Sequence, residues 1–130
     1  MKNVLFVIIC LLSASSFNHA IAQDNRVIRI AKIRIDELQL EAYKAAVKEQ
    51  IEAAIKNEPG VLTLYAVQDK NDPANVTVFE IYANQEAYQS HIQTAHFKKY
   101  KATTAEMVKS LELIDVTSIA MASKSNPQHR

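Results

Sequence analysis

Cysteine, glycine and tryptophan are scarce in this sequence of 130 residues, which has one Cys, one Gly and no Trp. A single cysteine cannot form an internal disulfide, so packing must supply the stability of the fold. Charge of one sign is not in excess either, because 15 Lys and Arg stand against 14 Asp and Glu. This balance gives no indication of nucleic acid or an anionic membrane surface as a partner.

The first residues have the pattern of a secretory signal peptide. A short positive start, Met1-Lys2-Asn3, precedes an apolar run, and Ala20-Ile21-Ala22 before Gln23 matches a signal peptidase site. The apolar run is short for a permanent anchor, and Cys10 lies inside it and not at the cleavage point, where a lipoprotein needs a cysteine. We therefore expect a signal peptide at 1–22 and a periplasmic or secreted protein with no membrane anchor after cleavage.

The chain that remains after cleavage has no thiol and no net charge. Cleavage removes Cys10 and also Lys2, which leaves 14 cationic against 14 acidic side chains. A cysteine nucleophile and a cysteine-based metal site are thereby excluded. The length suits one domain, which we place at 23–122, followed by a polar C-terminal tail at 123–130.

Residue periodicity in the first half of the domain predicts a strand and then a helix. Residues 26–36 are rich in β-branched side chains whose parity changes near residue 30, which predicts a bulge there. Asp36 can cap a helix, with Gln39 as a weak capping box, and apolar residues then recur at helical spacing as far as Ile55. The segment 57–60 ends this helix, because it contains proline and the only glycine of the chain.

The second half predicts a hairpin, two helices and a last strand. Strands at 61–67 and 75–83 flank a polar loop, and the second strand turns Val78, Glu80 and Tyr82 to one face and Thr77, Phe79 and Ile81 to the other. Asn84 can cap a helix that contains His91. After a bend at Thr94, a further helix is expected over 97–109 and a strand over 110–120.

This order of elements predicts an α+β fold of the ferredoxin-like, split βαβ type. Such a fold has an antiparallel sheet that is covered by helices on one face. The other face would expose Ile, Val and Tyr side chains, which is costly for a monomer. We therefore expect a homodimer that forms through the sheet.

The stretch FEIYANQEAYQSHIQTAHF closely resembles the central motif of the antibiotic biosynthesis monooxygenase family, which includes small quinol monooxygenases. In that motif an acidic residue and an aromatic residue end a strand, and an alanine, a histidine and a His-Phe pair follow. The matching positions here are Glu80, Tyr82, Ala87, His91, His96 and Phe97. The stretch NEPGVLTLYAV also resembles the helix-to-strand turn of the family, and the strand order matches across residues 26 to 120.

The resemblance implies a dimeric α/β barrel with an apolar cavity between the helices and the sheet. Family enzymes oxygenate an electron-rich aromatic with molecular oxygen and need no flavin, haem or metal, so we expect no cofactor. Once deprotonated, a phenol or quinol is itself a strong enough reductant, and the protein binds, orients and deprotonates it. The haem-degrading branch relies on a tryptophan near the end of this strand. Here Tyr82-Ala83 occupies that region, which disfavours haem degradation.

His91 and Tyr82 are the candidate catalytic residues. An imidazole titrates near neutral pH, so His91 could take the proton of a quinol, and Tyr82 could offer its hydroxyl to a substrate oxygen. Tyr65 could do the same from the neighbouring strand. The alternatives are that His91 only caps a helix or binds a backbone carbonyl, and that the tyrosines only pack in the core or the dimer interface.

His96 is a candidate substrate-binding residue at the rim of the pocket. It lies five residues after His91, or about 140° around an unbroken helix, so the two rings converge only if the chain bends at Thr94. A metal pair would more naturally be spaced by four residues. Since no third ligand is evident, we do not expect a metal site.

Three further side chains are candidates for substrate binding. Glu80 could orient a histidine, or it could form a cross-strand or intersubunit ion pair. Phe97 and Tyr100 are three residues apart, and they could form a wall for a planar aromatic or belong to the helix core.

The sequence therefore predicts an exported, cofactor-independent monooxygenase that oxidises a quinol or a related phenolic aromatic with molecular oxygen. The alternative is a non-catalytic or stress-responsive dimeric module that holds a small hydrophobic ligand in the same cavity. A third possibility is a structural dimer whose cavity is vestigial.

Overall fold

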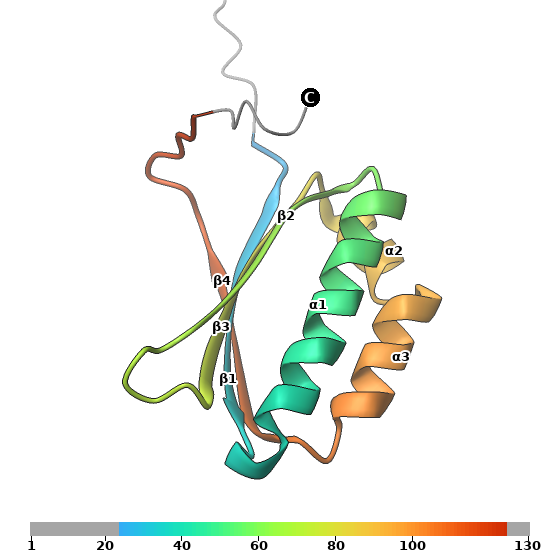
Figure 1. The fold of residues 1–130 in the computed structure, drawn as a ribbon. Helices are drawn as coiled ribbons and strands as arrows, with labels where there is room; N and C mark the ends of the chain where they lie inside the picture. The colour runs from blue at the N-terminus through green and yellow to red at the C-terminus, as the bar shows by residue number, and fades with distance from the viewer. Residues whose placement is uncertain (1–23, 125–130) are drawn as a thin grey trace, which may run out of the picture.

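A computed structural model describes residues 24–124, which form one antiparallel sheet of four strands with all the helices on one face (Figure 1). The order along the chain is β1 (Val27–Ile35), the 3₁₀ turn η1 (Glu37–Gln39), α1 (Leu40–Asn57), β2 (Val61–Gln68), β3 (Asn75–Tyr82), α2 (Gln85–His91), α3 (Ala95–Thr104) and β4 (Val108–Val116). The strand order across the sheet is β2-β3-β1-β4, so the predicted α+β ferredoxin-like class is confirmed.

The ends of the chain lie outside this description. The predicted signal peptide at 1–22 is among the residues that are not described, and so are residues 125–130 of the predicted tail. Within residues 24–124, no helix combines the length and the apolar character that a membrane crossing requires.

The predicted bulge near residue 30 is wrong. β1 pairs with β3 without interruption from Val27 opposite Tyr82 to Arg34 opposite Asn75. The irregularity lies at the other end of β1, where the pairing with β4 shifts between Arg34 and Ile35. Apolar residues simply occupy both faces of β1: Ala31, Ile33 and Ile35 face the main core, and Ile30 lies on the outer face opposite Phe79, so regular alternation accounts for the pattern.

The ends of three elements differ from prediction. Asp36 caps η1, since its Oδ1 accepts a hydrogen bond from the Leu38 amide at 3.1 Å, and α1 begins later without a capping box. The last helix ends at Thr104, and β4 starts at Val108, earlier than expected. β4 starts at Val108 because this residue pairs with Ile35, the last residue of β1.

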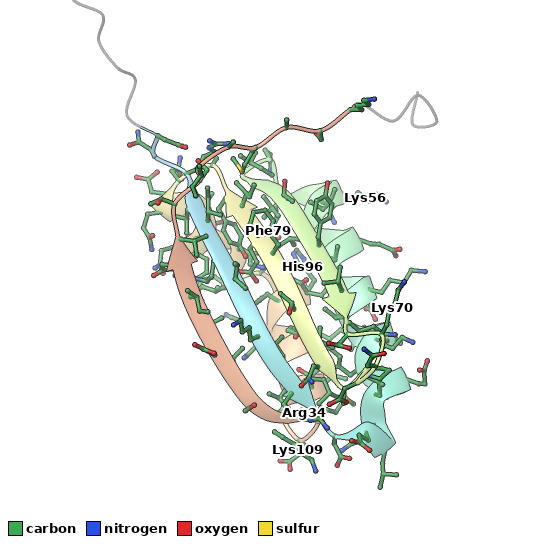
Figure 2. The ribbon with its side chains drawn as sticks, turned by 90° about the vertical axis from the view of Figure 1, so that its left-hand side faces the viewer. Arg34, Lys56, Lys70, Phe79, His96 and Lys109 are labelled. Carbon is green, nitrogen blue, oxygen red and sulfur yellow. The ribbon has the colours of Figure 1, made fainter. Side chains whose placement is uncertain are left out.

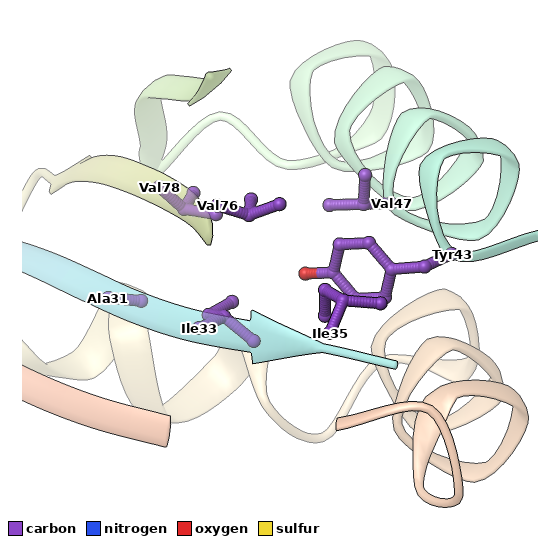
Figure 3. Packing of buried hydrophobic residues seen from close by; sticks show 7 residues of the cluster. All are labelled: Ala31, Ile33, Ile35, Tyr43, Val47, Val76 and Val78. Atoms are coloured by element: carbon purple, nitrogen blue, oxygen red, sulfur yellow. The ribbon is translucent and has the colours of Figure 1, made fainter. Parts of the chain in front are cut away.

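The main core lies between the helices and the inner face of the sheet, as Figure 3 shows around the ring of Tyr43. Its buried residues come from β1, α1 and β3, and they are Ala31, Ile33, Ile35, Tyr43, Val47, Val76 and Val78. The hydroxyl of Tyr43 is 2.8 Å from the hydroxyl of Tyr100, so a partly buried hydrogen bond joins α1 to α3. Burial raises the pKa of Tyr43, which keeps this hydroxyl neutral.

Gly60 lets the turn between α1 and β2 pack closely against α2. The amide of Ala83 donates to the carbonyl of Gly60 at 2.8 Å, which fixes the start of β2 beside the end of β3. A Cβ on Gly60 would lie 2.5 Å from the Cβ of Ala87, much closer than two carbon atoms can approach. The turn therefore requires glycine for space, and this contact sets the position of α2 over the sheet.

Replacing Gly60→Ala is expected to destabilise the fold by about 1–3 kcal/mol, because the added methyl group overpacks the contact with α2. The free energy of unfolding from urea titration measures this loss. In the double variant Gly60→Ala/Ala87→Gly, the space is restored, so the two substitutions should couple favourably. Additive effects of the two changes would contradict the contact.

Candidate active site

A cavity of about 300 Å³ lies between the inner face of the sheet and the helices α1, α2 and α3. Five of the seven predicted site residues line it, and they are Glu80, Tyr82, His91, Phe97 and Tyr100. Glu80 and Tyr82, which were predicted to share one face of β3, both line the cavity, so this face of β3 is the inner one. The cavity also includes Arg29 and Gln50, which the sequence did not single out.

Tyr65 and His96 lie elsewhere. Tyr65 pairs with Phe79 on the outer face of the sheet and its side chain is 64% exposed, so the expectation that it lines this cavity is wrong. His96 does not line this cavity; it lies beside a much smaller hollow between α1 and α3. Figure 2 shows Phe79 on the outer face of the sheet, with His96 beyond the strands.

Two capped helices bring the histidines together. Asn84 caps α2 by accepting from the Ala87 amide at 2.8 Å, and α2 ends at His91. Thr94 then caps α3 by accepting from the Phe97 amide at 3.3 Å, and its hydroxyl donates to the His91 carbonyl at 2.7 Å. The predicted bend at Thr94 is confirmed, and it places the two imidazole centroids 6.2 Å apart.

A carboxylate connects the two rings. Oε2 of Glu58 lies 2.9 Å from His91 Nδ1 and 2.6 Å from His96 Nε2. A carboxylate can only accept hydrogen bonds, so both of these ring nitrogens carry a proton. The side chain of His91 is 2% exposed and that of Glu58 is 12% exposed, so this contact is largely shielded from water.

The other nitrogen of His91 is an acceptor at the cavity wall. The side-chain amide nitrogen of Gln50, on α1, lies 3.1 Å from His91 Nε2. An amide NH₂ group donates, so Nε2 accepts in this arrangement, and the two contacts of the ring fit the tautomer with its proton on Nδ1. Both partners of this bond line the cavity.

Glu58 and Gln50 could not be recognised from the local sequence. Glu58 lies in the segment that ends α1, where an acidic residue beside proline and glycine has no evident partner. Its contacts with His91 and His96 depend on the packing of the turn at Gly60 against α2. No metal site was expected because the sequence showed no third ligand beside His91 and His96. Glu58 is such a third ligand in the structure.

Aromatic rings surround His91 on the cavity side. The ring centroid of Phe97 is 5.0 Å away in an edge-to-face arrangement, and that of Tyr82 is 5.3 Å away. Tyr82 in turn packs edge-on against Tyr88 at 5.3 Å. Such walls suit a flat aromatic ligand and bring it beside the imidazole.

Charged groups lie at the β1–β3 side of the cavity. Arg29 forms an ion pair with Asp115, with 2.7 Å between Nε and Oδ1, and its guanidinium lies 4.3 Å from the centroid of the Tyr88 ring. Glu80 is the residue opposite Arg29 on β3. Burial raises the pKa of Glu80, although the charge of Arg29 and a hydrogen bond from Tyr82 oppose the shift. Burial also raises the pKa of Tyr82, and the neighbouring Glu80 adds to that rise.

The raised pKa of Glu80 predicts a pH-dependent cost to stability. The folded protein binds this proton more tightly than the unfolded chain, whose pKa is near the ordinary 4.5. The stability that Glu80 contributes is therefore present below that value and is lost as pH rises through the raised pKa. Glu80→Gln removes this loss, so unfolding titrations should show the variant gaining stability over the wild type as pH rises.

The exposed residue Glu106 offers a matched control for this measurement. Glu106→Gln should shift the unfolding free energy equally at acidic and neutral pH. A constant difference between Glu80→Gln and the wild type across this range would show that the buried carboxyl has no raised pKa.

Comparisons with known proteins bear on the whole domain. The family model for antibiotic biosynthesis monooxygenase matches residues 26–103. A crystal structure from Bacteroides thetaiotaomicron VPI-5482, named "putative antibiotic biosynthesis monooxygenase", is 51% identical with a TM-score of 0.75, and the match covers 78% of this chain and 97% of that one. No curated protein matches the sequence.

Two more distant structures share the fold. A "putative monooxygenase" from Lactobacillus acidophilus NCFM is 33% identical with a TM-score of 0.71, over 74% of this chain but only 46% of that longer one. A protein of Nitrosomonas europaea is 22% identical with a TM-score of 0.70, over 75% of this chain and 93% of its own, which is a likeness of fold alone. With the family model covering more than half of the sequence, the chain belongs to the antibiotic biosynthesis monooxygenase family.

Proposed function

We propose that this chain is an exported monooxygenase that oxidises a quinol or a related phenolic aromatic with molecular oxygen, as a homodimer and without a cofactor. The observation that carries the proposal is the acceptor nitrogen of His91 at the wall of the cavity. Family membership supports monooxygenase chemistry, and the form of the cavity supports a flat aromatic substrate.

The proton acceptor is prepared for this task by its two neighbours. Glu58 accepts from Nδ1 of His91, and the carboxylate stabilises the imidazolium that forms when Nε2 takes a proton. A phenolic hydroxyl that enters the cavity replaces the Gln50 amide as the donor to Nε2. Since an amide and a hydroxyl both donate, this exchange leaves no buried acceptor unsatisfied.

The reaction needs no external reductant because the substrate supplies all the electrons. A quinol that carries a ring hydrogen combines with O₂ to give a hydroxyquinone and water, so one oxygen atom enters the product and the other leaves as water. His91 takes the hydroxyl proton, the phenolate passes one electron to O₂, and the radical pair forms the new carbon–oxygen bond. The proton then returns from His91 to the peroxide, and loss of water, which takes the ring hydrogen, completes the reaction.

Other cavity residues bind and orient the substrate in this proposal. The raised pKa of Tyr82 keeps its hydroxyl neutral, so that it can donate to a substrate oxygen. Phe97 and Tyr100 form a wall against the aromatic ring. Arg29 brings positive charge to the same cavity, and this charge favours the phenolate over the neutral phenol.

The outer face of the sheet supports the proposed homodimer. One row of side chains crosses all four strands on this face, with neighbours in the order Tyr65, Phe79, Ile30 and Ile114. The helices cover only the opposite face (Figure 1). A second copy that packs its sheet on this row would remove the apolar side chains from water. The proposed export is supported by the pattern of the first 22 residues of the sequence.

His91→Gln is expected to lower the rate of quinol oxidation by about 10²–10⁴-fold, the usual contribution of a general base. Oxygen uptake with a panel of reduced naphthoquinols measures the rate. Lys109→Gln, at an exposed position of β4, should leave the rate unchanged. A wild-type rate no greater than that of buffer, or a His91→Gln rate equal to the wild-type rate, would contradict the proposed function.

Phe79→Asp is expected to convert the dimer to a monomer, because a charge on the apolar row cannot be buried without a partner. The molar mass from light scattering should fall to that of one chain. Leu38→Asp introduces the same charge at a side chain that is 96% exposed on η1, so it should leave the mass unchanged. A monomeric wild type would sink the dimer proposal.

Gln50 is the observation that favours the second candidate, a module that binds a hydrophobic ligand without catalysis. As long as its amide occupies His91 Nε2, the cavity can hold an aromatic molecule but cannot deprotonate it. This candidate is favoured if aromatic ligands raise the melting temperature while no product forms.

A further inference from the structure

We propose that Glu58, His91 and His96 form a binding site for a divalent transition metal ion, with Zn²⁺ as the ion that best fits the donors. The three potential ligand atoms all lie within 4.8 Å of one another. Two imidazole nitrogens and one carboxylate oxygen are a donor set that Zn²⁺ uses with an open fourth position. The site requires that the ring proton that now points to Glu58 moves to the other nitrogen of each imidazole, so that a neutral ring binds the metal.

The geometry is close to that of a coordination shell. Zinc bonds to nitrogen and oxygen of about 2.0–2.1 Å place tetrahedral ligand atoms about 3.3–3.4 Å apart. Oε2 of Glu58 now lies 2.9 Å and 2.6 Å from the two ring nitrogens, so each of these contacts must lengthen by less than an ångström, and the two ring nitrogens, which lie within 4.8 Å of each other, must settle at the same separation. The backbone of this region is already fixed, because Thr94 bonds to the His91 carbonyl and caps α3.

Gln50 supplies the outer support that metal-bound histidines usually have. When His91 binds a metal through Nδ1, its Nε2 must carry the proton and needs an acceptor. Rotation of the Gln50 carboxamide by 180° would put its oxygen where its nitrogen now lies, 3.1 Å from Nε2. The same residue can therefore satisfy His91 with or without a metal.

The metal site is separate from the substrate cavity. Of the three ligands only His91 lines the cavity, and it would bind the metal through the nitrogen that points away from Gln50. The His96 side chain is 21% exposed, so an ion can enter from the solvent side. If the proposed function holds, an ion here would also stop catalysis, since Nε2 of His91 would become a donor.

Titration calorimetry of the full chain without a histidine tag tests the site. Zn²⁺ should bind with one ion per chain, whereas Mg²⁺, which prefers oxygen donors, should not bind. His96→Gln should abolish Zn²⁺ binding, and Glu58→Gln is a second variant that should weaken it. A thermal melt of each variant establishes that it is folded.

His129→Gln is the matched control, because it also removes one imidazole and lies outside the three proposed ligands. It should bind Zn²⁺ as the wild type does. Absence of Zn²⁺ binding to the wild type overturns the site, and so does equal affinity in the folded His96→Gln variant. Zinc binding is measured apart from quinol oxidation, so failure of the proposed function leaves this test intact.

Discussion

The Glu58 carboxylate is the group on which the arrangement of the site depends. One oxygen atom accepts hydrogen bonds from His91 and from His96, so it joins the end of α1 to the end of α2 and the start of α3. Without this acceptor the buried Nδ1–H of His91 would have no partner, which costs about 1–3 kcal/mol. The same contact fixes which nitrogen of His91 is protonated. Fold stability and the chemistry available at the cavity therefore depend on one carboxylate.

The two faces of the sheet differ in the side chains that they carry and in what covers them. The inner face has a packed core around Tyr43 and a cavity farther along the same strands. The inward positions of β3 are Val76 and Val78 in the core and then Glu80 and Tyr82 in the cavity. Burial penalises charge in this cavity, and it raises the pKa of Glu80 and of Tyr82. The outer face carries an apolar row that crosses all four strands, and it has no helix over it. One antiparallel sheet thus provides a pocket on one side and, on the other, the apolar row through which we propose that the homodimer forms.

The sequence predicted features that depend on local periodicity and capping. The element order, the alternation of side chains along β3 and the bend at Thr94 were recognised in this way, because each is set by neighbouring residues. Glu58 and Gln50 were missed, since their partner His91 is 33 and 41 residues away along the chain. Tyr65 was misplaced because the pairing of β2 with β3 shifts between Val61 and Thr63, so that Leu64 and not Tyr65 follows Val61 on the inner face.

The tautomer of His91 tests the account most directly. Long-range ¹H–¹⁵N correlation spectra of the metal-free protein, labelled at histidine, distinguish the two neutral forms of the ring. Contacts with Glu58 and Gln50 predict a proton on Nδ1 and a bare Nε2, and the Glu58→Gln variant should lose this preference. A wild-type spectrum with the proton on Nε2 would contradict the account, because His91 would then have no acceptor to offer a substrate.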